Sequence, residues 1–180
     1  IQDAYYLNAF SKAYDHLAEK TSKQEMKRLL KQNAQSLVEG ELFIRQQFFK
    51  ELGIDDKEMA EQPIAPTCYH YISHIYRQFE EENVAIAFAS LLPCPWLYHD
   101  LGKALNLRPS PEVLYQKWIE TYITDELEQQ IKEETELVNQ LYSESDELDK
   151  KKMLEAFRIS VYMEAQFWEM AYQHQTWKST

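Results

Sequence analysis

The feature that most constrains the fold is a helical spacing of apolar residues in a chain with few turn-forming residues. In the first part of the chain, Tyr6, Phe10, Tyr14 and Leu17 recur at intervals of three and four residues. That spacing places them on one face of an α-helix, and no stretch alternates long enough to predict a strand. Glycine occurs only 3 times in 180 residues. The sequence therefore predicts an all-α protein, and its length suits a single domain over residues 1–180.

Charge and cysteine content exclude several classes of protein. The formal net charge of −11 argues against a nucleic-acid-binding protein, which needs a basic surface. We expect no stretch to be long and apolar enough to span a membrane, and no signal peptide is visible, so neither nucleic acid nor membrane is expected as a partner. Cys68 and Cys94 lack CxxC spacing, which suggests a reducing compartment and no zinc site. We expect a cytoplasmic protein.

Capping residues predict where the second long helix begins and ends. Thr21 and Ser22 are placed to cap it, with a glutamine and a glutamate three residues further on. Gly53 supplies a stop, so the helix should end near Glu51.

Two further helices are predicted in the second half of the chain. Ser110–Pro111 is an N-cap followed by a first-turn proline, so a helix should run from there towards Tyr142. Ser145 or Asp146 should cap the last helix, which continues to about His174. The apolar residues expected on its buried side are Met153, Phe157, Val161, Phe167 and Trp168.

The segment 91–100, Leu-Leu-Pro-Cys-Pro-Trp-Leu-Tyr-His-Asp, interrupts an apolar helix that begins near Val84. Pro95 is tolerated best in the first turn of a helix, so Cys94 falls at, or one residue before, a new helix start. Backbone N–H groups and the helix dipole favour a thiolate there. Tyr98 lies four residues on, on the same helical face. The alternative is a buried structural cysteine beside a proline kink.

Two acidic residues interrupt apolar helical faces. Asp3 precedes Tyr6, and Glu164 lies one turn before Phe167. A carboxyl group among aromatic side chains is desolvated, which favours its protonated form unless it is paired, and such a group can donate a proton near neutral pH. The alternative for each acid is a solvent-facing position on an amphipathic helix. The 12 tyrosines point to a polar-lined pocket, because buried phenol groups need hydrogen-bond partners.

Standard catalytic motifs are absent from the sequence. It contains no GxSxG, P-loop, GxGxxG or HExxH pattern. His70 and His74 have the i, i+4 spacing of a metal-binding pair, but no nearby acid or thiol completes a site. No metal site is therefore predicted.

Six segments in order along the chain resemble the TenA family, the thiaminase-II type aminopyrimidine aminohydrolases of thiamin salvage. They are Gln2–Leu7, Glu39–Glu41, Tyr69–Tyr76, Leu91–Tyr98, Tyr115–Tyr122 and Glu164–Trp168. The blocks Leu-Pro-Cys-x-Trp-x-Tyr and Glu-x-x-Phe-Trp are the most specific. The family's opening helix is absent, in keeping with a chain that starts at Ile1 inside a helical pattern.

The resemblance implies a heme-oxygenase-like helical bundle, usually a homotetramer, that binds an aminopyrimidine or thiamin and needs no metal or organic cofactor. By position, Cys94 would be the nucleophile and Glu164 the acid/base group that protonates a ring nitrogen. Asp3 would bind the exocyclic amine and the adjacent ring nitrogen. The other matched positions would form the pocket, with Tyr6, Tyr98 and Phe167 as stacking walls and Tyr71 and Tyr122 as hydrogen-bonding groups near the thiol and the acid.

The implied reaction converts 4-amino-5-aminomethyl-2-methylpyrimidine to its hydroxymethyl counterpart and ammonia, with thiamin cleavage as a related activity. Where many relatives have Glu-x-x-x-His, this chain has Glu41 followed by Arg45. An arginine cannot ligate a cation, which counts against a metal-dependent relative. A heme or di-iron oxygenase on the same fold is a further alternative, disfavoured by the scattered histidines. In the remaining alternative, a non-catalytic binding or regulatory protein, the pocket residues would be core.

Overall fold

A computed structural model describes residues 1–178, in which the regular structure consists of α-helices and one π-helical turn, with no strand. This confirms the all-α prediction. The chain forms two compact units. Unit 1 comprises Ile1–Glu82 together with the chain from Tyr162 onward, and unit 2 comprises Asn83–Val161. Helix α10 (Glu147–Tyr172) contributes residues to both units.

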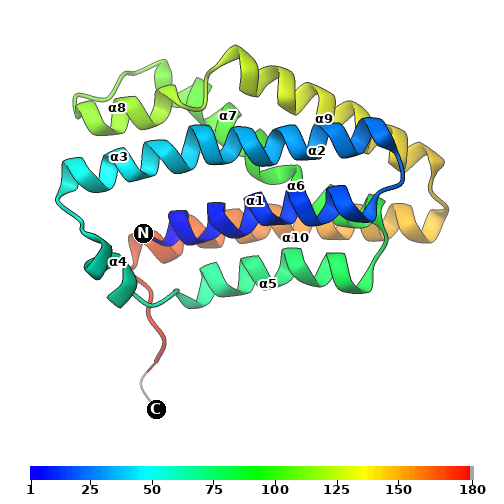
Figure 1. Ribbon diagram of the computed structural model, residues 1–180, viewed down its shortest axis with the longest axis horizontal. Helices are drawn as coiled ribbons and strands as arrows, with labels where there is room; N and C mark the ends of the chain where they lie inside the picture. The colour runs from blue at the N-terminus through cyan, green and yellow to red at the C-terminus, as the bar shows by residue number, and fades with distance from the viewer. Residues whose placement is uncertain (179–180) are drawn as a thin grey trace. The chain divides into compact units, whose positions relative to one another are not determined.

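Unit 1 is organised around its first helix. Its helices are α1 (Gln2–Lys20), α2 (Gln24–Leu37), α3 (Phe43–Leu52), α4 (Asp56–Glu61), α5 (Pro66–Glu81) and the end of α10. Helix α1 packs against both α2 and α5, as the blue ribbon between them shows (Figure 1). The predicted stripe on α1 is confirmed, because Tyr6, Phe10, Tyr14 and Leu17 are all buried.

The predicted second helix is interrupted by a π-helical turn, η1 (Val38–Leu42), between α2 and α3. The predicted helix ends as expected: Gly53 has a φ of 71°, and the Ile54 N–H donates to the Phe49 carbonyl at 2.9 Å. The start of the helix differs from the prediction. The N-cap is Lys23 without a side-chain cap, because the Thr21 hydroxyl oxygen accepts from the Lys23 N–H at 3.2 Å and so caps no helical N–H.

Helix α5 receives its cap from a distant part of unit 1. Pro66 occupies the first turn, and the N-cap Ala65 has no side chain that can accept a hydrogen bond. The Thr67 N–H instead donates to Oε1 of Gln175 at 3.0 Å. Trp177 holds the same C-terminal segment in place, since its Nε1 donates to the Ile64 carbonyl at 2.8 Å.

Unit 2 is built on the helix that the prolines interrupt. It contains α6 (Val84–Leu91), α7 (Pro93–Asn106), α8 (Val113–Glu120), α9 (Asp125–Glu144) and the first part of α10, and α6 and α7 both pack against α9. The Asn83 side chain caps α6 by accepting from the N–H groups of Ala85 and Ile86 at 3.0 and 3.1 Å.

By length and composition alone, Val84–Asn106 could cross a membrane, contrary to the expectation from sequence. More than half of its most apolar window is buried inside the protein, as in a core helix. Burial within the fold therefore accounts for the apolar character of this run.

The helix predicted from Ser110 to Tyr142 is two helices. Ser110 accepts from the Glu112 N–H at 3.2 Å, and α8 begins only at Val113. The chain turns after Glu120, and the Thr124 hydroxyl oxygen starts α9 by accepting from the Leu127 N–H at 3.2 Å. Tyr122 consequently lies in this turn rather than in the predicted helix, and it is buried.

The buried face of α10 differs from the prediction by one position at several residues. Its buried residues recur every three or four positions, at Met153, Ala156, Ser160, Glu164, Phe167 and Met170. Val161 and Trp168 lie beside this face and are 45% and 43% exposed, and Phe157 is only partly buried, so those predictions are wrong. The cap is confirmed, because Oδ1 of Asp146 accepts from the Asp149 N–H at 2.9 Å.

Gly102 allows α7 to approach the turn that follows α8. A Cβ atom at this position would lie 2.9 Å from Cβ of Tyr122 and 3.2 Å from Cγ2 of Ile123. Neither atom is at the end of a flexible side chain, so the backbone of the turn would have to move.

We predict that Gly102→Ala lowers the free energy of unfolding by about 1–3 kcal/mol, the usual cost of overpacking. Gly40→Ala is the matched control, because a Cβ there would meet nothing within 4 Å. Urea unfolding followed by circular dichroism measures both. Equal stability of Gly102→Ala and the wild type would show that the turn is not tightly packed on α7.

Candidate active site

Glu164 is a buried carboxyl group in unit 1. Its side chain lies on the buried face of α10 and the residue is only 1% exposed. The Tyr71 hydroxyl, from α5, donates a hydrogen bond to Oε1 of Glu164 at 2.8 Å, and both side chains are buried. A buried carboxyl group requires such a partner. The hydrogen bond also gives the carboxyl group a defined orientation.

Tyr71, the hydrogen-bond partner of this carboxyl group, belongs to an aromatic cluster. The rings of Tyr6 and Tyr71 stack with centroids 4.7 Å apart. Phe167, one turn after Glu164 on α10, has its ring centroid 5.6 Å from that of Tyr6 at an interplanar angle of 57°. These three rings and the carboxyl group bring α1, α5 and α10 together. Tyr71 therefore links the carboxyl group to the rings of Tyr6 and Phe167.

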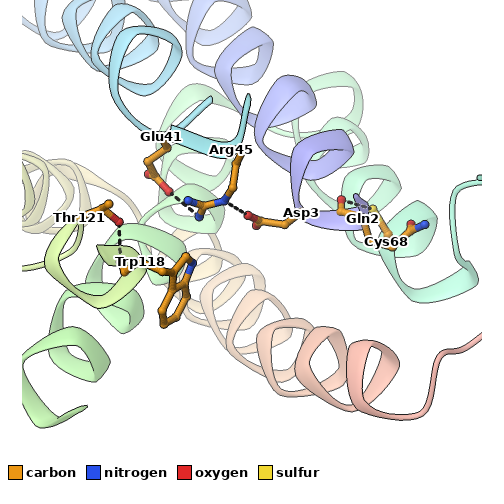
Figure 2. A network of polar contacts seen from close by, with 7 residues as sticks. All are labelled: Gln2, Asp3, Glu41, Arg45, Cys68, Trp118 and Thr121. Carbon is orange, nitrogen blue, oxygen red and sulfur yellow. Dashed lines mark hydrogen bonds and ion pairs between the residues drawn. The ribbon is translucent and has the colours of Figure 1, made fainter. Parts of the chain in front are cut away.

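Asp3 lies one turn before Tyr6 on α1 and is held by a buried cation. Nε of Arg45, on α3, donates a hydrogen bond to Oδ2 of Asp3, and its Nη2 lies 3.6 Å from Oε2 of Glu41 (Figure 2). Arg45 is only 6% exposed. Arginine is rarely buried so fully unless it is paired, so the two carboxylates account for its position.

Cys94 is the second residue of α7 in unit 2, where the sequence predicts a new helix start. Pro93 and Pro95 lack N–H groups, so the regular helical hydrogen bonds to the carbonyls of Ala89 and Leu91 are missing. The carbonyl of Ser90, which lies between these two, accepts a hydrogen bond from the Ser160 hydroxyl at 2.7 Å. This hydrogen bond connects the interrupted helix to α10. The Cys94 residue is 6% exposed.

Tyr98, one turn after Cys94, belongs to a second aromatic cluster. Its ring centroid lies 5.0 Å from that of Tyr122, which in turn lies 5.0 Å from that of Trp118. His99 fixes the turn that carries Tyr122, because its Nδ1 donates to the Tyr122 carbonyl at 2.7 Å. The turn is also closed by a hydrogen bond from the Thr121 hydroxyl to the Trp118 carbonyl at 2.8 Å (Figure 2).

The second cysteine has a different environment. Cys68 is fully buried in unit 1, and its Sγ donates to the Gln2 carbonyl at 3.5 Å. Burial, with a smaller contribution from the negative charge of Asp3, raises the pKa of the Cys68 thiol from 9.0 to about 12. Cys68 is therefore an unreactive thiol at neutral pH.

Within residues 1–178, no group of three or more histidine, cysteine, aspartate or glutamate side chains could hold a metal ion. His70 and His74 therefore do not form part of such a group. Nδ1 of His74 lies 3.4 Å from Nε2 of Gln78.

The eight site residues predicted from sequence thus fall into two clusters, one in each unit. Unit 1 holds Asp3, Tyr6, Tyr71, Glu164 and Phe167, and unit 2 holds Cys94, Tyr98 and Tyr122. Sequence reasoning treated Arg45 only as a departure from a family pattern and missed its pairing with Asp3. An arginine among Phe43, Ile44 and Phe49 was the available signal, because a cation in an apolar stretch needs a partner.

Comparison with known proteins extends over the whole chain. Residues 1–174 match the model of the TENA/THI-4/PQQC family. An aminopyrimidine aminohydrolase of Bacillus subtilis (strain 168) is 36% identical over 180 residues, which cover 100% of this chain and 76% of that protein. A protein of the same name from Staphylococcus carnosus (strain TM300) is 30% identical over 98% of this chain and 78% of its own length.

Solved structures show the same fold at lower identity. A TenA homologue from Pyrococcus furiosus superposes with a TM-score of 0.86 over 95% of this chain and 80% of that one, at 19% identity. A TenA homologue from P. horikoshii OT3 gives a TM-score of 0.84 at 21% identity, over 96% of this chain and 79% of the other. The helices, the match of the family model and the relatives agree, and the chain belongs to the TENA/THI-4/PQQC family.

Proposed function

We propose that the protein is an aminopyrimidine aminohydrolase that converts 4-amino-5-aminomethyl-2-methylpyrimidine and water to the 5-hydroxymethyl compound and ammonia. The observation that carries this proposal is the buried carboxyl group of Glu164, held by Tyr71, whose ring stacks on that of Tyr6 in a cluster that includes Phe167. Planar heterocycles bind well between aromatic rings, and a fixed carboxyl group can exchange a proton with a ring nitrogen. The curated relatives with this activity support the same substrate class.

In this proposal Cys94 and Glu164 act on the same pyrimidine. The Cys94 thiolate forms a bond to a ring carbon while Glu164 gives a proton to a ring nitrogen, which makes the ring electron-rich. The amine takes a proton from solvent and leaves the methylene group as ammonia, while ring electrons form a double bond to that carbon. Water adds to the same carbon and releases one proton to solvent. The bond to sulfur then breaks, and the ring returns its proton to Glu164. With the thiazole of thiamin as leaving group, the same steps cleave thiamin.

The other residues of the two clusters have binding roles in this proposal. Asp3 accepts a hydrogen bond from the exocyclic amine, and Tyr6 and Phe167 hold the ring. Tyr98, one turn after Cys94, is a further stacking wall, and Tyr122, whose ring centroid lies 5.0 Å from that of Tyr98, hydrogen-bonds near the thiol. We also propose that the protein acts in the cytoplasm and that it is a homotetramer. Size-exclusion chromatography with light scattering tests the oligomeric state.

We predict that Cys94→Ser folds and binds the pyrimidine but loses at least about a thousandfold in kcat, because a hydroxyl replaces the covalent nucleophile. Cys68→Ser is the matched control and should keep near-normal turnover, since the Cys68 thiol has a pKa of about 12 and is not a thiolate at neutral pH. Ammonia release with the aminomethylpyrimidine and with thiamin measures both variants. Near-normal turnover by Cys94→Ser would contradict the mechanism, and no hydrolysis by the wild type would favour a non-catalytic binding protein.

A second prediction concerns the acid. Glu164→Gln should lower kcat by about a hundredfold or more with little change in substrate binding, because an amide cannot supply the proton. Tyr71→Phe should lower kcat less, by about tenfold, since it removes the hydrogen bond that orients the carboxyl group but not the acid itself.

Tyr76→Phe is the control for Tyr71→Phe. Tyr76 lies on the same helix and donates to the Ala9 carbonyl at 3.3 Å, away from Glu164. The kcat of Tyr76→Phe, measured by steady-state kinetics, should equal that of the wild type. An unchanged kcat in Glu164→Gln would exclude Glu164 as the proton donor.

A further inference from the structure

Arg45 is a buried cation that no step of the proposed reaction uses. It lies on α3 directly after the π-helical turn η1, and its residue is 6% exposed. Removing a guanidinium group from water is costly unless carboxylates replace its hydration. The fold supplies two of them, Asp3 from α1 and Glu41 from η1 (Figure 2).

The two contacts differ in geometry. Nε of Arg45 donates directly to Oδ2 of Asp3, whereas the distance from its Nη2 to Oε2 of Glu41 is 3.6 Å. The Asp3 side chain is 30% exposed, while that of Arg45 is 7% exposed. The cation is therefore enclosed, and the carboxylate that it holds reaches towards solvent. Asp3 is thus available to a ligand, and Arg45 is positioned to orient it.

We propose that Arg45 is a positioning residue that makes Asp3 a fixed acceptor and so selects pyrimidines with an amino group over those with an alkoxy group at the same ring position. This inference rests on the proposed function, in which Asp3 binds the exocyclic amine. While the ion pair with Arg45 holds, Asp3 is a carboxylate, and a carboxylate accepts hydrogen bonds but donates none. An amino group offers it a donor.

An alkoxy group presents only an acceptor to the same carboxylate. Its lone pairs then face those of Asp3, and the hydrogen bond to a charged group is lost. Without Arg45, the Asp3 side chain can rotate away from the ligand, so it holds the amino group less firmly and repels the alkoxy group less. Discrimination between the two ligands therefore depends on Arg45, although Arg45 itself contacts Asp3 rather than the substrate.

The test is binding of two pyrimidines to the full chain by isothermal titration calorimetry. The ligands are 4-amino-5-hydroxymethyl-2-methylpyrimidine and its 4-methoxy counterpart, neither of which has an amine leaving group. We expect the wild type to bind the amino compound about tenfold to hundredfold more tightly, the value of one hydrogen bond to a charged group. Arg45→Met should reduce this ratio to less than about threefold.

Arg77→Met is the matched control. Arg77 also pairs with a carboxylate, Glu81, at 2.7 Å, but it lies on the exposed side of α5. The ratio should be unchanged in this variant. If Arg45→Met does not fold, Arg45→Lys decides the question, because it keeps the positive charge and should retain a ratio within about threefold of the wild type.

A double-mutant cycle separates positioning from a general structural role. In the Asp3→Asn background, where the carboxylate is gone, adding Arg45→Met should leave the ratio as it is. A folded Arg45→Met protein with the wild-type ratio, or a folded Arg45→Lys protein that loses it, overturns the inference and leaves the proposed function standing. A wild type that binds neither pyrimidine overturns the proposed function and this inference with it.

Discussion

The hydrogen bond from Tyr71 to Glu164 allows unit 1 to bury a carboxyl group whose partner belongs to an aromatic cluster. Glu164 lies on the same face of α10 as the core residues Met153 and Phe167, so the helix can pack only if this polar group has a partner. Helix α5 supplies that partner at the position where its own buried face meets α10. The same contact satisfies and orients a buried carboxyl group, which is why we propose the proton transfer there.

In unit 2, the Cys94 thiol lies at the start of a helix in the middle of an apolar run. Pro93 and Pro95 break the run without redirecting it, because Leu92 keeps helical backbone angles of φ −55° and ψ −35°. Beside this break, the Ser160 hydroxyl donates a hydrogen bond to the Ser90 carbonyl. The backbone of α7 at Gly102 then admits the turn that brings Tyr122 beside Tyr98. The position of Cys94 thus depends on the neighbouring prolines, and that of Tyr122 depends on packing between residues far apart in the chain.

The sequence predicted the helical fold and the helix ends that depend on one residue, such as the left-handed Gly53 and the Asp146 cap. It failed where helices end for reasons of packing, as in the turn before Thr124, and where a face rotates by one residue, as at Val161 and Trp168. Contacts between residues far apart in the chain were beyond it. Arg45 and Asp3 are 42 positions apart, and neither residue alone indicates the other.

The central claim is that the Cys94 thiolate and the Glu164 carboxyl group act on one pyrimidine ring. A crystal structure of the Cys94→Ser protein with 4-amino-5-aminomethyl-2-methylpyrimidine bound tests it most directly. The account predicts one ring with the side chain of residue 94 within about 4 Å of a ring carbon and the Glu164 carboxyl group within hydrogen-bond distance of a ring nitrogen. A pyrimidine bound against only one of the two side chains would contradict it.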